Sequence, residues 1–190
     1  MKERPILFSD AMVRAILAGT KTQTRRAVKP QPARMTESQQ RGRFFWFESG
    51  DEGNVREGRC PYGVPGDRLW VRETFSQSLD TGEVIWYWAD GNPRDDGWTR
   101  AKPSIHMRRA HSRITLEIKS VRVERLHDIS EADAIAEGID WSPTMGGYNC
   151  AGEWRNHSVP IYRQLWESIN GAGAWDANPW VWVIEFERVG

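Results

Sequence analysis

The stretch RITLEIKSVRVERL, residues 113–126, decides the fold class of this chain. Every second residue in its first half is apolar, namely Ile114, Leu116 and Ile118. That alternation is the period of a half-buried β-strand. Val121 and Val123 continue the apolar pattern on the opposite parity, so we expect a bulge or bend near Ser120.

On both sides of this strand the chain alternates between strand and helix signals. Shorter strands are predicted at residues 6–8, 69–74, 83–89 and 180–187. Helices are predicted at AMVRAILAG, SEADAIAEG and PIYRQLWESIN, residues 11–19, 130–138 and 160–170. The strands are too scattered for regular βαβ units. The order therefore predicts an α+β fold in which a small, partly closed, mixed β-barrel is flanked by helices.

Local signals mark the ends of these helices. Gly19 and Gly138 stand where a helix would stop. Ser130 and Asp133 have the spacing of a capping box, and Pro160 occupies a first turn, where proline is tolerated. The buried side of the last helix is predicted from its aliphatic residues, Ile161, Leu165 and Ile169.

Three long segments interrupt this pattern, near residues 29–65, 90–112 and 140–157. The first is rich in Pro, Gly, Gln and charge, and we expect one short strand in it, at FFWF (44–47). A chain of 190 residues is long enough for one domain with a proper core. We therefore predict a single domain over residues 1–190, with the three segments as loop insertions.

Charge is balanced over the chain but not along it. There are 26 basic and 26 acidic residues, yet residues 1–43 hold ten basic and three acidic ones, a local charge of +7. A neutral whole argues against a protein that coats nucleic acid by electrostatics alone. The basic segment suits a small anionic or nucleotide-like ligand, or a short nucleic-acid segment.

Cysteine usage and hydropathy suggest a cellular setting. Cys60 and Cys150 are far apart, so neither a disulfide framework nor a C-x-x-C metal pair is predicted. His106 and His111 lack a third ligand at a fixed spacing, and we expect no metal and no cofactor. The start MKERPILFSD lacks the apolar run of a signal peptide, and no window approaches 18 apolar residues. The expectation is a reduced, soluble, cytoplasmic protein that does not enter a membrane.

The segment AGTKTQTRR, residues 18–26, concentrates hydroxyls and cations directly after a predicted helix end. The carboxyl end of a helix carries partial negative charge and favours the cations placed there. The segment is either a solvated basic turn or one wall of a reactive pocket.

GTKTQTRR resembles the G-x-K-x-x-E-x-R signature of the ASCH domain family, relatives of the PUA-like β-barrel domains. Gly19, Lys21 and Arg26 match the signature, and Thr24 stands where many members carry glutamate. Four further stretches, in the same order, are similar to ASCH proteins carried by phages and prophages: PGDRLWVRETF, KPSIHMRRAHSRITLEI, DISEADAIAEGI and DANPWVWVIEF.

This resemblance implies a PUA-like curved barrel with the signature beside a cleft. The family was proposed to bind RNA, and some small bacterial members hydrolyse the acetyl amide of N4-acetylcytidine. Those enzymes use a lysine and a threonine three apart in the signature and a glutamate on a later helix. Lys21, Thr24 and Glu137 stand at the matching positions. The present chain is much longer than those enzymes.

Amide cleavage needs a nucleophile, a base and an acid for the leaving amine. Thr24 supplies a hydroxyl, and Lys21 can act as base only if its pKa falls from about 10.4. Arg25, Arg26 and partial burial would lower that pKa. Glu137 would protonate the leaving nitrogen or hold a water. Residues three apart face opposite sides of a strand, so KTQT must curve if Lys21 and Thr24 cooperate.

Other residues are candidates for holding the substrate. Arg26 either contacts the ligand or pairs with Glu137 or Glu73, and Glu73 is a rival carboxylate at a strand end. In PSIHMRR, residues 103–109, Ser104 and His106 can hydrogen-bond a base or sugar. Arg109, with its neighbour Arg108, can meet a phosphate. The same loop could equally be anchored by its own turn bonds.

The leading hypothesis is a metal-independent amidohydrolase of an acylated pyrimidine nucleoside. Its partner would be a small nucleoside-like substrate or single-stranded RNA. The alternative is a PUA-like RNA-binding module in which Lys21, Arg25 and Arg26 touch phosphates, or a ribonuclease built on the same groove. Trp70, Trp86 and Trp88 either stack on a base or pack the barrel.

Overall fold

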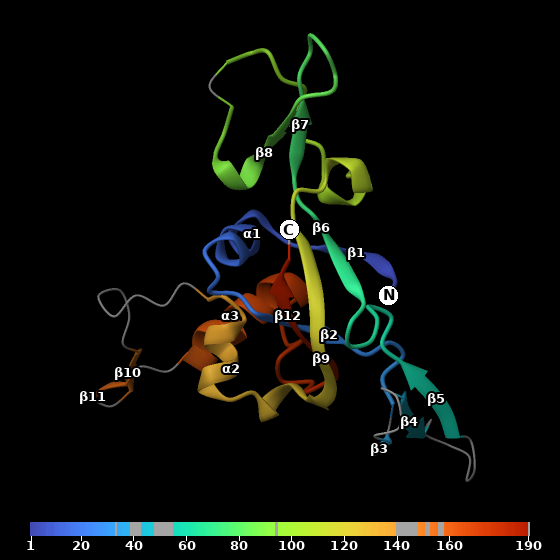
Figure 1. Ribbon diagram of the computed structural model, residues 1–190. Coiled ribbons are helices and arrows are strands. Elements are labelled where there is room, and N and C mark those ends of the chain that lie inside the picture. Colours follow the sequence, from blue (N-terminus) through green and yellow to red (C-terminus); the bar gives the residue numbers. More distant parts are fainter. Residues whose placement is uncertain are drawn as a thin grey trace.

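The computed structural model describes residues 1–32, 34–38, 43–47, 55–93, 95–139, 148–150, 153–155 and 158–189. They form an α+β fold, as predicted, whose body is a curved five-stranded sheet in the order β1-β6-β9-β12-β2 (Figure 1). The strands are β1 (Glu3–Leu7), β2 (Gln23–Ala27), β6 (Arg68–Arg72), β9 (Thr115–Arg125) and β12 (Trp180–Arg188). β1 runs parallel to β6, and the other neighbours are antiparallel.

The long strand predicted at residues 113–126 is β9, and its bend lies where the parity of the apolar pattern changes. Ser120 pairs with Glu185 of β12, whereas Ile118 pairs with Phe186, so Lys119 is an extra residue on β9. An extra residue in one strand bends it and increases its twist. The expected bulge near Ser120 is confirmed.

The sheet separates two hydrophobic cores, and β12 contributes to both by strict alternation. Trp182, Ile184 and Phe186 join the core beneath α1 (Asp10–Leu17). Val181 and Val183 join the core beneath α2 (Glu131–Ala136) and α3 (Ser158–Asn170). Successive side chains of a strand point to opposite faces, so one strand can serve both layers.

The helix ends follow the predicted signals. Gly19 and Gly138 both have a φ of +76°, the left-handed conformation that ends a helix. The Ser130 hydroxyl accepts a hydrogen bond from the Asp133 backbone N–H, and the capping box is complete. Pro160 lies in the first turn of α3, also as predicted.

The predicted buried side of α3 is wrong in part. Tyr162 and Trp166 are its buried large side chains, Ile161 and Leu165 are half-buried, and Ile169 is 53% exposed. Aromatic rings at i and i+4 lie on one face of a helix and bury more apolar area than isoleucines do. The rings therefore set the rotation of α3 against the sheet.

The segment 29–65 holds more structure than the one strand expected there. FFWF lies in β4 (Arg43–Phe47), as predicted, but β4 is flanked by β3 (Arg34–Ser38) and β5 (Val55–Arg59) in an antiparallel sheet. RMTES and VREGR lack the apolar alternation that signals a strand. Segment 140–157 lies partly outside the described residues, and its described parts are β10 (Tyr148–Cys150) and β11 (Glu153–Arg155).

A smaller lobe projects from the end of β6. It contains β7 (Phe75–Gln77), β8 (Ile85–Tyr87) and the short 3-10 turns η1 (Trp88–Asp90), η2 (Ser104–His106) and η3 (Arg109–His111). A further turn, η4 (Leu126–Asp128), follows β9. In Figure 1 this lobe and the β3-β4-β5 sheet extend from opposite ends of the body. The strand predicted at 83–89 is thus a short strand followed by a turn.

The described strands form an open sheet with β1 and β2 at its two edges. The edges approach each other through Arg26, whose Nη2 donates to the carbonyl of Leu7 at 2.6 Å. The Arg26 guanidinium also lies over the ring of Phe8, 5.4 Å from its centroid. In the described ranges, none of the helices combines the length and apolar character that a bilayer crossing requires.

Candidate functional site

The signature segment docks against the end of α2. Lys21 forms an isolated antiparallel bridge with Glu137, and the Thr22 N–H donates to the carbonyl of Ala136 at 2.9 Å. β2 begins only at Gln23. Lys21 therefore lies just before the strand that carries Thr24 and pairs with the end of α2.

Gly138 makes this close approach possible. A Cβ atom at position 138 would lie 2.6 Å from the Cβ of Lys21 and 2.9 Å from the Cβ of Ala15. Both distances are shorter than carbon atoms tolerate, and the φ of +76° also favours glycine. The glycine that ends α2 thus also admits the lysine.

The Lys21 ammonium is fully enclosed and has three oxygen acceptors. Its Nζ lies 2.8 Å from the carbonyl of Gln23, 2.7 Å from the carbonyl of Glu137 and 3.0 Å from Glu137 Oε2. Burial lowers the pKa of Lys21 below its ordinary value, although Glu137 raises it. The charges of Arg26 and Arg25 lower it further. The predicted direction holds, but burial is a larger cause than the arginines.

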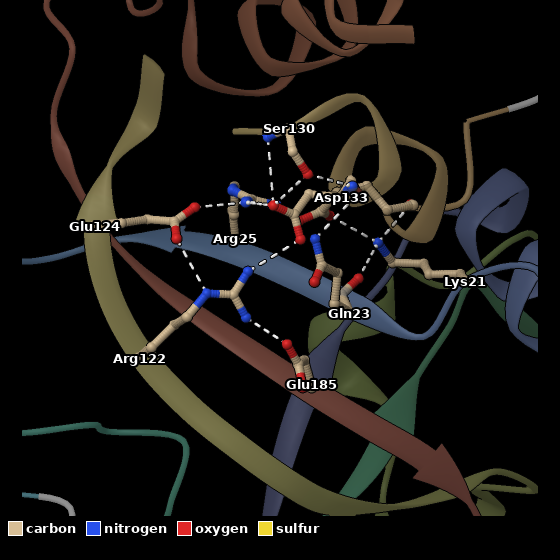
Figure 2. A network of polar contacts seen from close by, with 9 residues as sticks. Lys21, Gln23, Arg25, Arg122, Glu124, Ser130, Asp133 and Glu185 are labelled. Carbon is tan, nitrogen blue, oxygen red and sulfur yellow. Dashed lines mark hydrogen bonds and ion pairs between the residues drawn. The ribbon is translucent and has the colours of Figure 1, made fainter. Parts of the chain in front are cut away.

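Arg25, rather than Arg26, pairs with Glu137. Its Nη1 lies 3.3 Å from Glu137 Oε1, and its Nη2 lies 2.5 Å from Glu124 Oε1 and 3.2 Å from Asp133 Oδ2 (Figure 2). The sequence hypothesis that Arg26 pairs with Glu137 or Glu73 is therefore wrong, since Arg26 donates to a backbone carbonyl. Alternation along β2 explains the exchange: Arg25 points to the α2 face and Arg26 to the α1 face.

Around this centre lies a ring of further charges (Figure 2). Arg122 binds Glu124 at 3.0 Å, Asp133 at 3.0 Å and also Glu185. Burial would raise the pKa of Asp133, but the hydrogen bond from Ser130 and the charge of Arg25 hold it below its ordinary value. The capping-box carboxylate therefore also fixes the position of the buried arginine.

A hollow of about 50 Å³ opens beside Glu137. Its walls are formed by β2, helices α1 and α3, and the end of α2. The lining residues include Met12, Thr24, Glu137, Tyr162, Trp166 and Ile169. Tyr162 was not singled out by the sequence analysis, although its spacing to Trp166 was available as a signal. Burial and the charge of Glu137 raise the pKa of Tyr162 well above its ordinary value, so its hydroxyl keeps its proton.

The hollow lies at the open edge of β2. Phe186 N–H donates to the carbonyl of Thr22, so residues 22, 24 and 26 direct their peptide groups toward β12. The peptide groups of Gln23 and Arg25 consequently face the free edge, where the carbonyl of Gln23 receives Lys21. Thr24 pairs with Ile184 and shares its face of the sheet, whereas Glu137 approaches from the other face.

Lys21 reaches the same face as Thr24. Its Nζ lies 5.5 Å from the centroid of the Phe8 ring, and the Cζ of Arg26 lies 5.4 Å from that centroid. The structure thus brings Lys21 and Glu137 into direct contact, and places Thr24 and Arg26 along the wall of the adjoining hollow. A second, larger hollow of about 450 Å³ is lined by Lys21 and by residues at the end of α1.

Glu73 belongs to a separate centre. It is 1% exposed, and Arg113 binds both of its oxygens, with Nε to Oε1 and Nη2 to Oε2 at 3.0 Å each. Arg113 also binds Asp90 at 2.6 Å. Glu73 is thus a partner of Arg113 at the base of the β7–β8 lobe and lies outside the lining of the hollow at Thr24.

The candidates from PSIHMRR lie in the same lobe. Arg109 pairs with Glu3 at 3.0 Å, and Ser104 begins the turn η2. His106 lines another hollow, of about 240 Å³, together with Arg108. The structure therefore does not bring Ser104, His106 or Arg109 to the hollow at Thr24.

The three tryptophans considered for base stacking have structural contacts. Trp70 is buried beneath the guanidinium of Arg72, 4.6 Å from its ring centroid. Trp86 and Trp88 donate their indole N–H groups to acceptors within the β7–β8 lobe. Trp70 is thus part of the packed body, whereas Trp86 and Trp88 are half-buried in the lobe, and base stacking by these two stays a prediction.

The remaining candidates for chemistry are thiols and metal ligands. Cys60 is buried, and burial raises the pKa of its thiol to about 11, whereas the side chain of Cys150 lies outside the described part. In the described ranges, His, Cys, Asp and Glu side chains form no group of three placed to hold a metal ion. No family model matches the chain, and neither a curated protein nor a solved structure matches it.

Proposed function

We propose that the chain is a PUA-like protein of the ASCH type that hydrolyses the amide of an acylated pyrimidine nucleoside such as N4-acetylcytidine. The proposal rests on the resemblance of five sequence stretches and on one structural observation above all. Lys21 and Glu137, 116 positions apart, form a buried pair at 3.0 Å beside a hollow that Thr24 also lines. Separate segments, before β2 and at the end of α2, supply these two groups.

The fold supports the proposal at a coarser level. The sheet curves until Arg26 of one edge strand reaches the carbonyl of Leu7 in the other. A PUA-like barrel would place its signature segment beside such a seam, and the hollow at Thr24 opens there.

Lys21 and Glu137 can exchange one proton. Transfer from Nζ to Oε2 would yield a neutral amine and a carboxylic acid, and burial lowers the pKa of Lys21 in the direction that this transfer needs. The amine would then accept the proton of the Thr24 hydroxyl while Oγ bonds to the acyl carbon. As the carbon–nitrogen bond breaks, Glu137 would give its proton to the leaving amine, which restores the ion pair.

Water completes the cycle in reverse. Glu137 takes a proton from water, whose oxygen bonds to the acyl carbon, and Lys21 returns a proton to the oxygen of Thr24. The carboxylic acid leaves, and Glu137 then gives its proton back to Lys21. Arg25 holds Glu137 Oε1 throughout, so that Oε2 alone changes its protonation.

The hollow restricts which part of the substrate enters. Its volume of about 50 Å³ is close to the share of two water molecules in the liquid, at ~30 Å³ each. Ligand pockets for whole drug-sized molecules are typically about 300–1,000 Å³. Under the proposal the acetyl end of the substrate would enter the hollow, and the nucleoside would lie outside it.

The test is release of cytidine from N4-acetylcytidine by the intact chain. Thr24→Ser should keep measurable turnover, and Thr24→Val should lose about 10³-fold, within the range of acid–base and nucleophilic contributions. An acyl group trapped on residue 24 by acid quench and mass spectrometry would identify the nucleophile. Absence of turnover by the folded chain would reject the amidase, and full turnover by Thr24→Val would reject the nucleophile.

The RNA-reader alternative receives less support from the geometry. It assigns phosphate contacts to Lys21, Arg25 and Arg26, yet the side chains of Lys21 and Arg25 are fully enclosed. A phosphate would have to displace their carboxylate partners before it could bind.

A further inference from the structure

The hollow of about 240 Å³ in the β7–β8 lobe has an unusual lining. Phe75 and Gln77 come from β7, and the remaining lining residues are Lys102, His106, Arg108 and His111. Among the residues that the structure describes, the lining thus has one lysine, one arginine, two imidazoles, one amide and one phenyl ring, and no carboxylate. The carboxylates of Glu73 and Asp90, in the same lobe, are both bound by Arg113.

Lys102 is held in place by the strand beside it. Its N–H donates to the carbonyl of Phe75 at 2.7 Å, and the Phe75 N–H donates back at 3.2 Å. Its Nζ contacts Gln77 Oε1 and lies 6.0 Å from the centroid of the Phe75 ring. One amide oxygen occupies one of its donors, so an ammonium with three donors keeps capacity for an anion.

Another wall of the hollow, formed by His106 and Arg108, is anchored by its backbone. Met107 is 1% exposed, and its neighbours His106 and Arg108 are both exposed and line the hollow. Arg72 Nη1 donates to the carbonyl of Ile105 at 3.2 Å and so fixes the start of this wall. The buried methionine and the arginine together hold the segment whose His106 and Arg108 side chains line the hollow.

His111 is fixed on two sides. Its ring stacks on Phe75, with centroids 6.0 Å apart and planes 21° apart. Its carbonyl accepts a hydrogen bond from the Tyr87 hydroxyl at 2.9 Å. An imidazole offers at least one N–H donor in either protonation state.

We propose that this hollow is a binding site for the phosphate group of a phosphate monoester. A phosphate monoester carries about −1.5 to −2 charges at neutral pH, which Lys102 and Arg108 match. A volume of about 240 Å³ equals the liquid share of roughly eight waters, enough for a phosphate and part of the group that it esterifies. The proposal is independent of the amidohydrolase, because its residues are separate from Lys21, Thr24 and Glu137.

The test is isothermal titration of the full chain at constant ionic strength with inorganic phosphate, cytidine 5′-monophosphate, cytidine and a single-stranded RNA that lacks terminal phosphates. The monophosphate should bind at least as tightly as inorganic phosphate, and cytidine should not bind at this hollow. Lys102→Gln and Arg108→Gln should each weaken binding by about 10-fold, the effect of losing one charge-assisted hydrogen bond.

Arg109→Gln is the matched control, because it removes the same charge from the next residue, whose guanidinium is bound to Glu3. It should change the dissociation constant by less than about twofold. The proposal is overturned if neither phosphate compound gives saturable binding, or if all three variants weaken binding equally. Tighter binding of the unphosphorylated RNA would also overturn it, since the surface would then recognise phosphodiesters. Thermal unfolding of each variant checks that the lobe is folded.

Discussion

Two buried carboxylates, Glu73 and Glu137, are neutralised in different ways. Arg113 binds both oxygens of Glu73 in a bidentate pair. The oxygens of Glu137 are divided between Lys21 and Arg25, at 3.0 and 3.3 Å. The first arrangement closes around its carboxylate, whereas the second adjoins a hollow. Glu137 thus has a lysine as one partner and a free space beside it, whereas burial raises the pKa of Glu73 although Arg113 binds both of its oxygens.

The pKa values of the cations in the two centres shift in opposite directions. Burial lowers the pKa of Lys21 despite the opposing charge of Glu137. Burial alone would also lower the pKa of Arg113, but its hydrogen bonds to Glu73 and Asp90 raise it above its ordinary value. We therefore interpret Lys21–Glu137 as the reactive centre and Glu73–Arg113 as a structural clamp.

The largest expected effect is on turnover of N4-acetylcytidine. Lys21→Met should lower kcat/KM by about 10³-fold, because the proton acceptor for Thr24 is lost. Arg113→Met, assayed at a temperature where it is folded, should stay within about threefold of the unsubstituted chain. Equal losses in the two variants would remove the distinction between the centres.

The next effect is on the free energy of unfolding, which Arg113→Met should lower more than Lys21→Met does. Arg113→Met should destabilise by about 2–3 kcal/mol, because Glu73 is left buried without its partner while Arg113 itself is a quarter exposed. Lys21→Met should cost less, since Glu137 keeps Arg25. Chemical denaturation measures both, and the double change Glu73→Leu with Arg113→Met should recover part of the loss.

A glycine pair tests how tightly the reactive centre is built. Gly19 and Gly138 share a φ of +76°, but only a Cβ at 138 would collide with Lys21, since nothing lies within 4 Å of one at 19. Gly19→Ala should cost about 1 kcal/mol for the backbone conformation alone. Gly138→Ala should cost more and also lower turnover. Equal costs and unchanged turnover would show that the close approach is unimportant.

The smallest effect concerns stability at alkaline pH. A folded pKa of Lys21 below its unfolded value means that the unfolded chain binds more protons between the two values. Lys21 therefore makes stability rise with pH in that window, up to about pH 10.4. The unfolding free energy of the unsubstituted chain minus that of Lys21→Met should rise accordingly. With Lys119→Met, at an exposed lysine whose pKa is raised, this difference should not rise.

Local chemistry made part of this structure predictable. Gly19, the Ser130–Asp133 box and the bulge near Ser120 each depend on a few neighbouring residues, and all three were found as predicted. The pairing of Lys21 with Glu137 was suggested by the family resemblance, since no periodicity relates positions so far apart.

What could not be predicted depends on contacts between distant segments. Whether Arg25 or Arg26 meets Glu137 depends on which face β2 turns toward α2. The rotation of α3 depends on how Tyr162 and Trp166 pack under the sheet. The separation of Glu73 from Lys21 follows from the path of β6 into the β7–β8 lobe. Each of these is fixed by tertiary packing rather than by the local sequence.

The most direct test of the account is the pKa of Lys21 itself. An NMR titration of ¹³C-labelled lysine side chains, with the Lys21 signal assigned by its loss in Lys21→Met, measures it in the intact chain. The account predicts that Lys21 titrates below every exposed lysine, including Lys119. A Lys21 pKa equal to or above those of the exposed lysines would contradict it, because the amine could then not accept a proton from Thr24.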